Sequence, residues 1–154
     1  MRIEDEIKQS HFQDEHQKAI INLLYTAGWL QLRQACAFKK FALTSPQFNI
    51  LRILRGQHPQ PATVALLIER MLDKTSNASR IVDRLQEKQF VTRTVCPANR
   101  RAVDIRITPA GLALLDQIDD SGALQTAAHA SLSEAEARQL NDLLDKMRDV
   151  DSPA

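Results

Sequence analysis

The sequence predicts a mainly α-helical protein with one small β-hairpin, an α+β fold, and two adjacent patterns in the middle of the chain indicate it. Between residues 74 and 89, apolar residues recur at helical spacing, at Ala78, Ile81, Val82 and Leu85. Two segments with strand-like alternation follow directly, at 91–96 and 103–107, around a short basic turn. The 154 residues, 44% hydrophobic and 25% charged, fit one globular domain with a sizeable core.

The first predicted helix is long, about twenty-five residues from position 17. Gly28 lies inside it, where it would permit a bend or the close approach of another backbone. Residues 1 to about 16 are polar and are expected to be frayed or to form an early helical turn. Trp29 and Leu32 lie off the main apolar stripe, so more than one face is apolar. Such a helix is expected to pack on its own domain and on a partner subunit.

Two shorter helices are predicted next. Thr44 and Gln47 have the spacing of a capping box, and Pro46 lies in the first turn, so a helix should run to Gly56. The next helix is expected to start near Thr63 and to bury four apolar residues: Val64, Leu67, Ile68 and Met71.

The segment from Lys74 is then expected to form the second helix of a helix-turn-helix. Ser76, Ser79, Arg80 and Asp83 lie opposite its apolar stripe, with Asn77 and Arg84 on the flank. Small hydrogen-bonding side chains and arginines near a helix N-terminus suit the major groove of DNA.

The hairpin after this helix has a basic end. Arg100 and Arg101 are adjacent in its predicted turn, Pro97–Arg101, and a basic hairpin of this kind suits phosphates or the minor groove. The combination predicts a winged helix-turn-helix. The alternative is a small α+β domain whose charged hairpin is merely solvated.

The C-terminal part is predicted to be helical. Thr108 and Pro109 start one helix, which weakens after Asp119 and is either kinked or split in two, and Ser133 begins another capping box. We expect three regions: an N-terminal dimerisation helix in 1–42, the winged helix-turn-helix in 43–108, and C-terminal dimerisation helices in 109–154. A monomeric helical cap is the alternative for the last region.

Charge separates along the chain. Nine basic and four acidic residues between Arg70 and Arg106 give +5, whereas three basic and nine acidic residues between Pro109 and Ala154 give −6. The middle segment therefore favours a polyanionic partner.

Several classes of function are not expected. We find no membrane-spanning stretch and no signal peptide, and Cys36 and Cys96 do not suggest a disulfide, so a reducing cytoplasm is expected. The four histidines have no metal-ligand spacing, and no catalytic motif or cofactor-binding motif is present, so an enzyme is not expected.

With the predicted helices and hairpin in this order, the sequence resembles the MarR family of winged helix-turn-helix transcription regulators over about residues 17–148. The resemblance rests on Leu43-Thr-x-x-Gln-Phe, on Ser79-Arg-Ile-Val-Asp-Arg-Leu85 and on the segment from Pro97 to Gly111. Two positions depart from the family pattern: Asn99 stands where an aspartate is usual in the wing, and Gln89 stands where the recognition helix usually ends in glycine. A left-handed cap at Gln89 would cost about 1 kcal/mol.

The resemblance implies a homodimeric regulator, most simply a repressor, on a pseudo-palindromic double-stranded operator. Asp83 matches an acidic position that orients the wing through a salt bridge. The expected DNA contacts come from the recognition segment and the wing: Lys74, Thr75, Ser76, Asn77, Ser79, Arg80, Arg84, Asn99, Arg100 and Arg101. The alternative is a dimeric interaction module that has kept the fold and lost DNA binding.

Many relatives in this family respond to small aromatic acids, phenols or oxidants. Trp29, Arg33, Phe48 and Arg52 are therefore a candidate effector cleft between the dimer arm and the wing domain, although core and surface roles are the alternative for these residues. A redox role for Cys36 or Cys96 is a further hypothesis. The alternative is that each is an inert small apolar residue, which is the more usual role of a lone cysteine.

Overall fold

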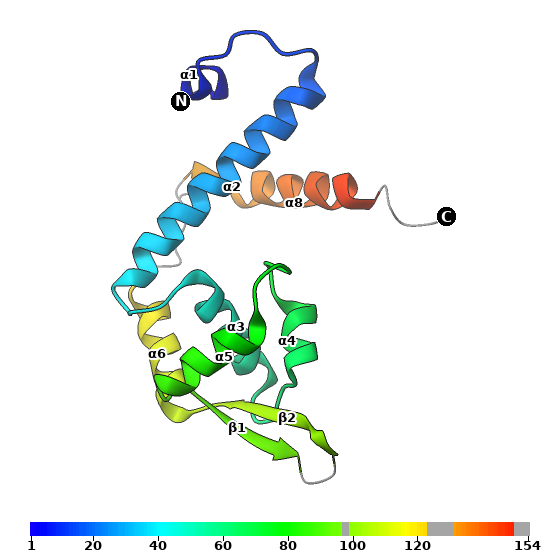
Figure 1. Cartoon of the computed structure of the whole chain (residues 1–154). Coiled ribbons are helices and arrows are strands. Elements are labelled where there is room, and N and C mark those ends of the chain that lie inside the picture. Colours follow the sequence, from blue (N-terminus) through cyan, green and yellow to red (C-terminus); the bar gives the residue numbers. More distant parts are fainter. Residues whose placement is uncertain (97–98, 123–130, 150–154) are drawn as a thin grey trace.

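The structure is a computed structural model that describes residues 1–96, 99–122 and 131–149, without the side chains of residues 96 and 99–102. It is mainly helical, with one two-stranded antiparallel sheet, which confirms the predicted fold class (Figure 1). In chain order the elements are α1 (Ile3–Ile7), α2 (Glu15–Lys39), α3 (Ser45–Gln57), α4 (Val64–Arg70), α5 (Ala78–Glu87), β1 (Val91–Cys96), β2 (Asn99–Ile107), α6 (Pro109–Asp120) and α8 (Glu134–Arg148).

Helix α3 is the centre of the hydrophobic core. Its residues Ile50, Leu51 and Leu54 are fully buried, and the other elements of the winged-helix body pack around them. Leu67 of α4, Val82 and Leu85 of α5, Val91 and Ile105 of the hairpin, and Leu115 and Ile118 of α6 complete the same cluster. The core therefore crosses the expected domain boundary at residue 108, because α6 packs on α3.

The hairpin is anchored to the body at its base. Val91 pairs with Ile107 and Val95 with Val103, and the backbone of Ala62 exchanges two 2.9 Å hydrogen bonds with that of Ile105. Gly111 packs beneath this base: a Cβ at that position would lie 2.5 Å from the carbonyl oxygen of Phe90. Only glycine fits there, so α6 can start directly under the hairpin.

Most predicted helix starts are confirmed. Thr44 and Ser133 both form complete capping boxes, and the hydroxyls of Thr63 and Thr108 cap α4 and α6. The prediction that Ile68 is buried is wrong: its side chain is 44% exposed, because it lies on the outer side of α4. Helix α6 ends at Asp120, and the continuation of the helix predicted to be kinked or split falls on residues 123–130, outside the described residues.

Helix α2 projects away from the winged-helix body (Figure 1). It is one continuous helix, and no other described segment lies within 4 Å of a Cβ placed on Gly28, so the described residues make no close approach there. Leu24 is 67% exposed on α2, and Leu143 is 57% exposed on α8. None of the helices in the described ranges has the length and apolar character needed to cross a bilayer.

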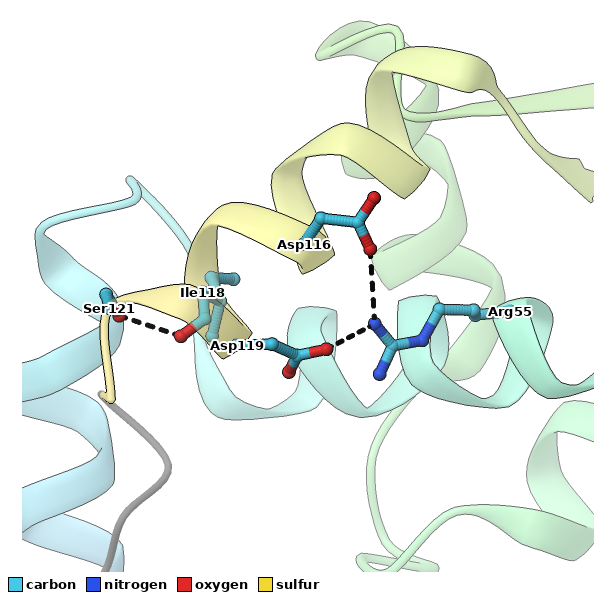
Figure 2. A network of polar contacts seen from close by, with 5 residues as sticks. All are labelled: Arg55, Asp116, Ile118, Asp119 and Ser121. Atoms are coloured by element: carbon cyan, nitrogen blue, oxygen red, sulfur yellow. Dashed lines mark hydrogen bonds and ion pairs between the residues drawn. The ribbon is translucent and has the colours of Figure 1, made fainter.

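One ion-pair network joins α3 to α6 (Figure 2). The Nη1 atom of Arg55 lies 2.6 Å from Oδ2 of Asp119 and 3.8 Å from Oδ1 of Asp116. At the end of α6, the hydroxyl of Ser121 donates a 2.7 Å hydrogen bond to the carbonyl oxygen of Ile118. Helix α6 is thus held by polar contacts at the end from which the chain leaves the winged-helix body.

Candidate nucleic-acid interface

Helix α5 presents a polar face to solvent and an apolar face to the core. Ala78, Val82 and Leu85 are buried, as the periodicity predicted. Ser79 and Arg80 are exposed on the outer face, in the first turn of the helix. This face has the dimensions and chemistry that the major groove accepts: little bulk, with hydrogen-bond donors and a fixed positive charge.

The helix starts later than predicted. Residues 74–77 precede α5, so the prediction that this segment is helical is wrong. The reason is a competing side-chain network around Asp73, in the tight turn that the sequence predicts around Leu72 and Asp73. Its Oδ1 accepts hydrogen bonds from the backbone N–H of Thr75 (2.9 Å) and the Thr75 hydroxyl (2.6 Å), and its Oδ2 accepts one from the Ser76 hydroxyl (2.6 Å). An aspartate followed two and three residues later by Thr and Ser is the sequence signal for such a turn.

These hydrogen bonds favour the ionised form of Asp73. The Ser76 hydroxyl, followed by the hydroxyl and the N–H of Thr75, lowers the pKa of the Asp73 carboxyl to about 2. Lys74 next to it is turned toward α4, where its ammonium group donates to the carbonyl oxygens of Ile68 (3.2 Å) and Glu69. The turn before α5 is therefore held by its own side chains.

Asn77 is the N-cap of α5. Its Oδ1 accepts a 3.1 Å hydrogen bond from the backbone N–H of Arg80. From the sequence, Asn77 is predicted to lie on the flank of the recognition helix. In the structure it lies just before the first residue of the helix, and its side-chain oxygen is used for capping. Its side chain therefore fixes where α5 begins.

An ion pair ties the wing to α5. Nη1 of Arg93 on β1 contacts Oδ1 of Asp83 on α5. Arg84, one of the expected DNA contacts, makes a 2.8 Å ion pair with Glu87 on the same helix, and that carboxylate raises the pKa of the Arg84 guanidinium. Of the arginines on α5, Arg80 is therefore the better placed for an external anion, because no described partner occupies it.

The expected wing residues fall in strand β2. The prediction that Asn99, Arg100 and Arg101 belong to the turn is wrong, because β2 begins at Asn99. The register breaks between Val95, which pairs with Val103, and Cys96, which pairs with Asn99, so Arg100 and Arg101 fall inside this irregularity. A bulge of this kind redirects side chains at the end of a hairpin. The side chains of Asn99, Arg100 and Arg101 lie outside the described part of the structure.

Two buried amides on α3 hold the two ends of the recognition segment. Oδ1 of Asn49 accepts a 3.0 Å hydrogen bond from the backbone N–H of Leu72, just before the Asp73 turn. At the other end, the Lys88 ammonium donates to Oε1 of Gln47 (3.3 Å) and to the carbonyl oxygen of Ala42. From the sequence, Gln47 is predicted only to cap α3, and Asn49 has no predicted role.

Comparisons with known proteins agree with this arrangement. Residues 43–103, which span α3 to the hairpin, match the model of the MarR family. The regulator MgrA of Staphylococcus aureus is 28% identical over 110 residues, which cover 71% of this chain and 73% of that protein. The chain belongs to the MarR family.

Two solved structures extend the match beyond the winged helix. A MarR transcription factor from Planctomyces limnophilus is 29% identical, with a TM-score of 0.66, and the match covers 90% of this chain and 98% of that one. Bordetella bronchiseptica BpsR, whose DNA binding is regulated by 6-hydroxynicotinic acid, is 23% identical, with a TM-score of 0.63, and the match covers 83% of this chain and 99% of that one. Like other MarR proteins, the chain is a DNA-binding transcription regulator and not an enzyme.

In this MarR protein, the candidate effector residues do not form one cleft. Phe48 and Arg52 line a cavity of about 660 Å³ between α2, α3 and the turn before α5. Trp29 and Arg33 lie elsewhere on α2: Trp29 lines a separate hollow beside α1, and the Arg33 guanidinium stacks 4.9 Å from the centre of the Trp29 ring. The prediction that the four residues share a cleft is wrong, because Trp29 and Arg33 point toward a different side of α2.

Other side chains complete the main cavity. Phe48 stacks on Phe38 with ring centroids 4.5 Å apart, which gives the cavity an aromatic wall. The remaining lining residues come from α2, α3 and the turn: Gln31, Gln34, Ala35, Ser45, Pro46, Asn49, Met71, Leu72 and Asp73. Among the described residues, no group of three His, Cys, Asp or Glu side chains could hold a metal ion.

Proposed function

We propose that this protein is a cytoplasmic homodimeric repressor that blocks transcription at its own or a neighbouring promoter. Two copies of α5 would enter successive major grooves of a pseudo-palindromic operator, with half-sites roughly 10 base pairs apart. A small aromatic effector would lower the affinity for this operator by stabilising a different dimer shape. The observation that carries the proposal is an exposed polar face on α5 joined by an ion pair to a basic hairpin.

The exposed apolar side chains of α2 and α8 support a homodimer. Large apolar residues are 37–67% exposed on both helices: Ile20, Leu23, Leu24, Trp29 and Leu32 on α2, and Leu140, Leu143 and Met147 on α8. Apolar surface of this extent on helices outside a core is typical of a subunit interface. A second copy of the chain offers the same helices and so fits them. Dimerisation would fall to α2 and α8, whereas α6 shares the winged-helix core.

The proposed DNA contacts fall into two groups, those to base edges and those to the DNA backbone. Ser79 and Arg80, on the outer face of α5, would contact base edges, with Asn77 and Arg84 beside them. The remaining proposed contacts would position the backbone of the duplex: Lys74, Thr75 and Ser76 before the helix, and Asn99, Arg100 and Arg101 in the wing.

The cavity beside Phe48 and Arg52 supports an effector with an aromatic ring and an acidic group. A volume of about 660 Å³ lies within the usual range for small-molecule sites, and it combines an aromatic wall with a guanidinium. The relative BpsR, regulated by 6-hydroxynicotinic acid, is an example of this ligand class. We favour a ligand over an oxidant because Cys36, the free thiol among the described side chains, has no second described thiol with which to form a disulfide.

Selection of bound sequences from random DNA tests the proposal. We expect a pseudo-palindrome that the protein binds in fluorescence anisotropy with a steep salt dependence. The Arg101→Ala variant should bind every sequence more weakly and should reduce the slope of log K against log[salt] by about 1. Failure to enrich any sequence, together with no binding of duplex DNA at low salt, would contradict the proposal and favour an interaction module that has lost DNA binding.

A further inference from the structure

The side chain of Asn49 lies where the cavity, α3 and the turn before the recognition helix meet. It is only 6% exposed, and it lines the cavity together with Leu72 and Asp73. Its Oδ1 accepts the hydrogen bond from the backbone N–H of Leu72. One side chain thus touches both the proposed effector site and the segment that sets the start of α5.

The other half of the same amide has no hydrogen-bond partner. Nδ2 of Asn49 is buried, and no donor–acceptor contact to it exists among the described residues. An unpaired buried N–H costs free energy, and nearly all such groups in folded proteins are paired. A leucine of similar volume would fill the space without that cost. The amide therefore has a donor that the folded chain does not use.

The cavity wall indicates which acceptor would suit this donor. Arg52 contributes the guanidinium of the lining, and Phe48 and Phe38 contribute the aromatic surface. The carboxylate in the lining, Asp73, has both oxygens bonded to Thr75 and Ser76. A flat aromatic molecule with a carboxylate or phenolate oxygen would pair with the guanidinium and leave a second acceptor for the amide.

We propose that Asn49 is the positioning residue through which an acceptor-bearing aromatic ligand in this cavity acts on the recognition helix. This inference rests on the effector function proposed above. Because Nδ2 is covered, a ligand oxygen reaches it only when the amide turns. Turning the amide moves Oδ1 away from the N–H of Leu72, so the ligand and the turn compete for one side chain.

The consequence falls on the start of α5. Without the Asn49 bond, the backbone at Leu72 loses its hydrogen bond to α3, and the hydrogen bonds described for the Asp73 turn that follows lie within residues 68–76. The first turn of α5 then samples more positions, and the polar face that meets the groove is less well placed. We expect the ligand to lower operator affinity by about tenfold, within the usual range of coupling between two sites.

Two substitutions separate the roles of the two amide atoms. Asn49→Asp keeps an oxygen for the N–H of Leu72 and replaces the donor by a second acceptor, whereas Asn49→Leu removes both. We expect Asn49→Asp to bind the selected operator at least about fivefold more tightly than Asn49→Leu. Gln117→Leu, the same type of change at an exposed amide on α6, serves as the control for loss of an amide alone.

The ligand response is measured with a panel of benzoates, hydroxybenzoates and chlorophenols, by anisotropy on the operator and by hydrogen exchange at the Leu72 amide. In the parent protein, a binding compound should lower operator affinity about tenfold and speed exchange at Leu72; Asn49→Asp should lose both responses.

The two proposals fail in different ways. If a compound releases DNA equally well from the parent and from Asn49→Asp, or if exchange at Leu72 does not change, the role of Asn49 is overturned and the effector function stands. Equal operator affinities for the Leu and Asp variants would also overturn the role of Asn49. If no compound in the panel binds the parent, the effector function fails and this inference fails with it.

Discussion

Nη1 of Arg55 on α3 lies 2.6 Å from Oδ2 of Asp119 on α6, and this ion pair joins two residues that are sixty-four positions apart in sequence (Figure 2). It lies at the point where the chain leaves the winged-helix body for the C-terminal helix. The pair holds α6, which shares the core of the winged-helix body, against α3.

Replacing Arg55 by methionine should destabilise the protein modestly. Both charged groups are about a third or more exposed, so solvent screens the pair, and we expect a loss of about 0.5 kcal/mol in the free energy of unfolding. The loss should shrink in 1 M NaCl. Urea denaturation at low and high salt measures it. Arg138→Met, which breaks an exposed pair within α8, is the control and should have a smaller effect; equal effects would argue against a role for Arg55 between helices.

Asn77 allows capping and base recognition to be separated. Asn77→Ala should shorten α5 and cost about 1 kcal/mol, because the N–H of Arg80 loses its acceptor. Asn77→Ser restores an oxygen at the cap but offers no amide to DNA. If Asn77 acts only as a cap, the serine variant should recover both stability and operator preference in anisotropy. A serine variant that is stable but has an altered sequence preference would instead assign Asn77 to base contact.

Asp73 gives a prediction for low pH. Its pKa in the folded protein is about 2, below its ordinary value of 3.8, so ionised Asp73 stabilises the turn fully above pH 3.8, and this stabilisation is lost as the pH falls toward 2. Asp73→Asn removes the acceptor for the Ser76 hydroxyl. The difference in unfolding free energy between parent and variant should therefore be constant from pH 8 to about 5 and decline below pH 4. A difference that changes around neutral pH would contradict the assignment.

Gln89 has a strained backbone conformation that glycine would relieve. Its φ is +62°, in the left-handed region, and the hydroxyl of Thr108 holds its carbonyl oxygen at 2.8 Å. The left-handed cost of about 1 kcal/mol is partly offset by the greater freedom of glycine in the unfolded chain. Gln89→Gly should therefore raise the melting temperature by about 1–2 °C. Gln89→Ala is the control, which keeps the strain and should give no increase.

The sequence predicted those parts of the fold that depend on local patterns. The caps at Thr44 and Ser133 and the buried stripe of α5 were predicted from spacing, and the structure confirms them. In each case the determining groups lie within a few residues of one another, so one segment of sequence contains the whole cause.

The misplaced features depend on contacts that cross the chain or compete with the helix. Asp73 draws Thr75 and Ser76 into a turn, so α5 starts four residues later than its composition suggests. The bond from Asn49 to Leu72 joins residues twenty-three positions apart, and no periodicity predicts it. Trp29 and Phe48 could not be assigned to different cavities without the direction in which α2 leaves the body.

The stoichiometry of the DNA complex tests the central claim most directly. Sedimentation equilibrium of the full chain with its selected duplex should give two protein chains per duplex, in a complex that dissociates as salt rises. One chain per duplex would contradict the proposed dimer. No complex with any duplex at low salt would contradict the assignment of α5 and the hairpin as a DNA-binding surface.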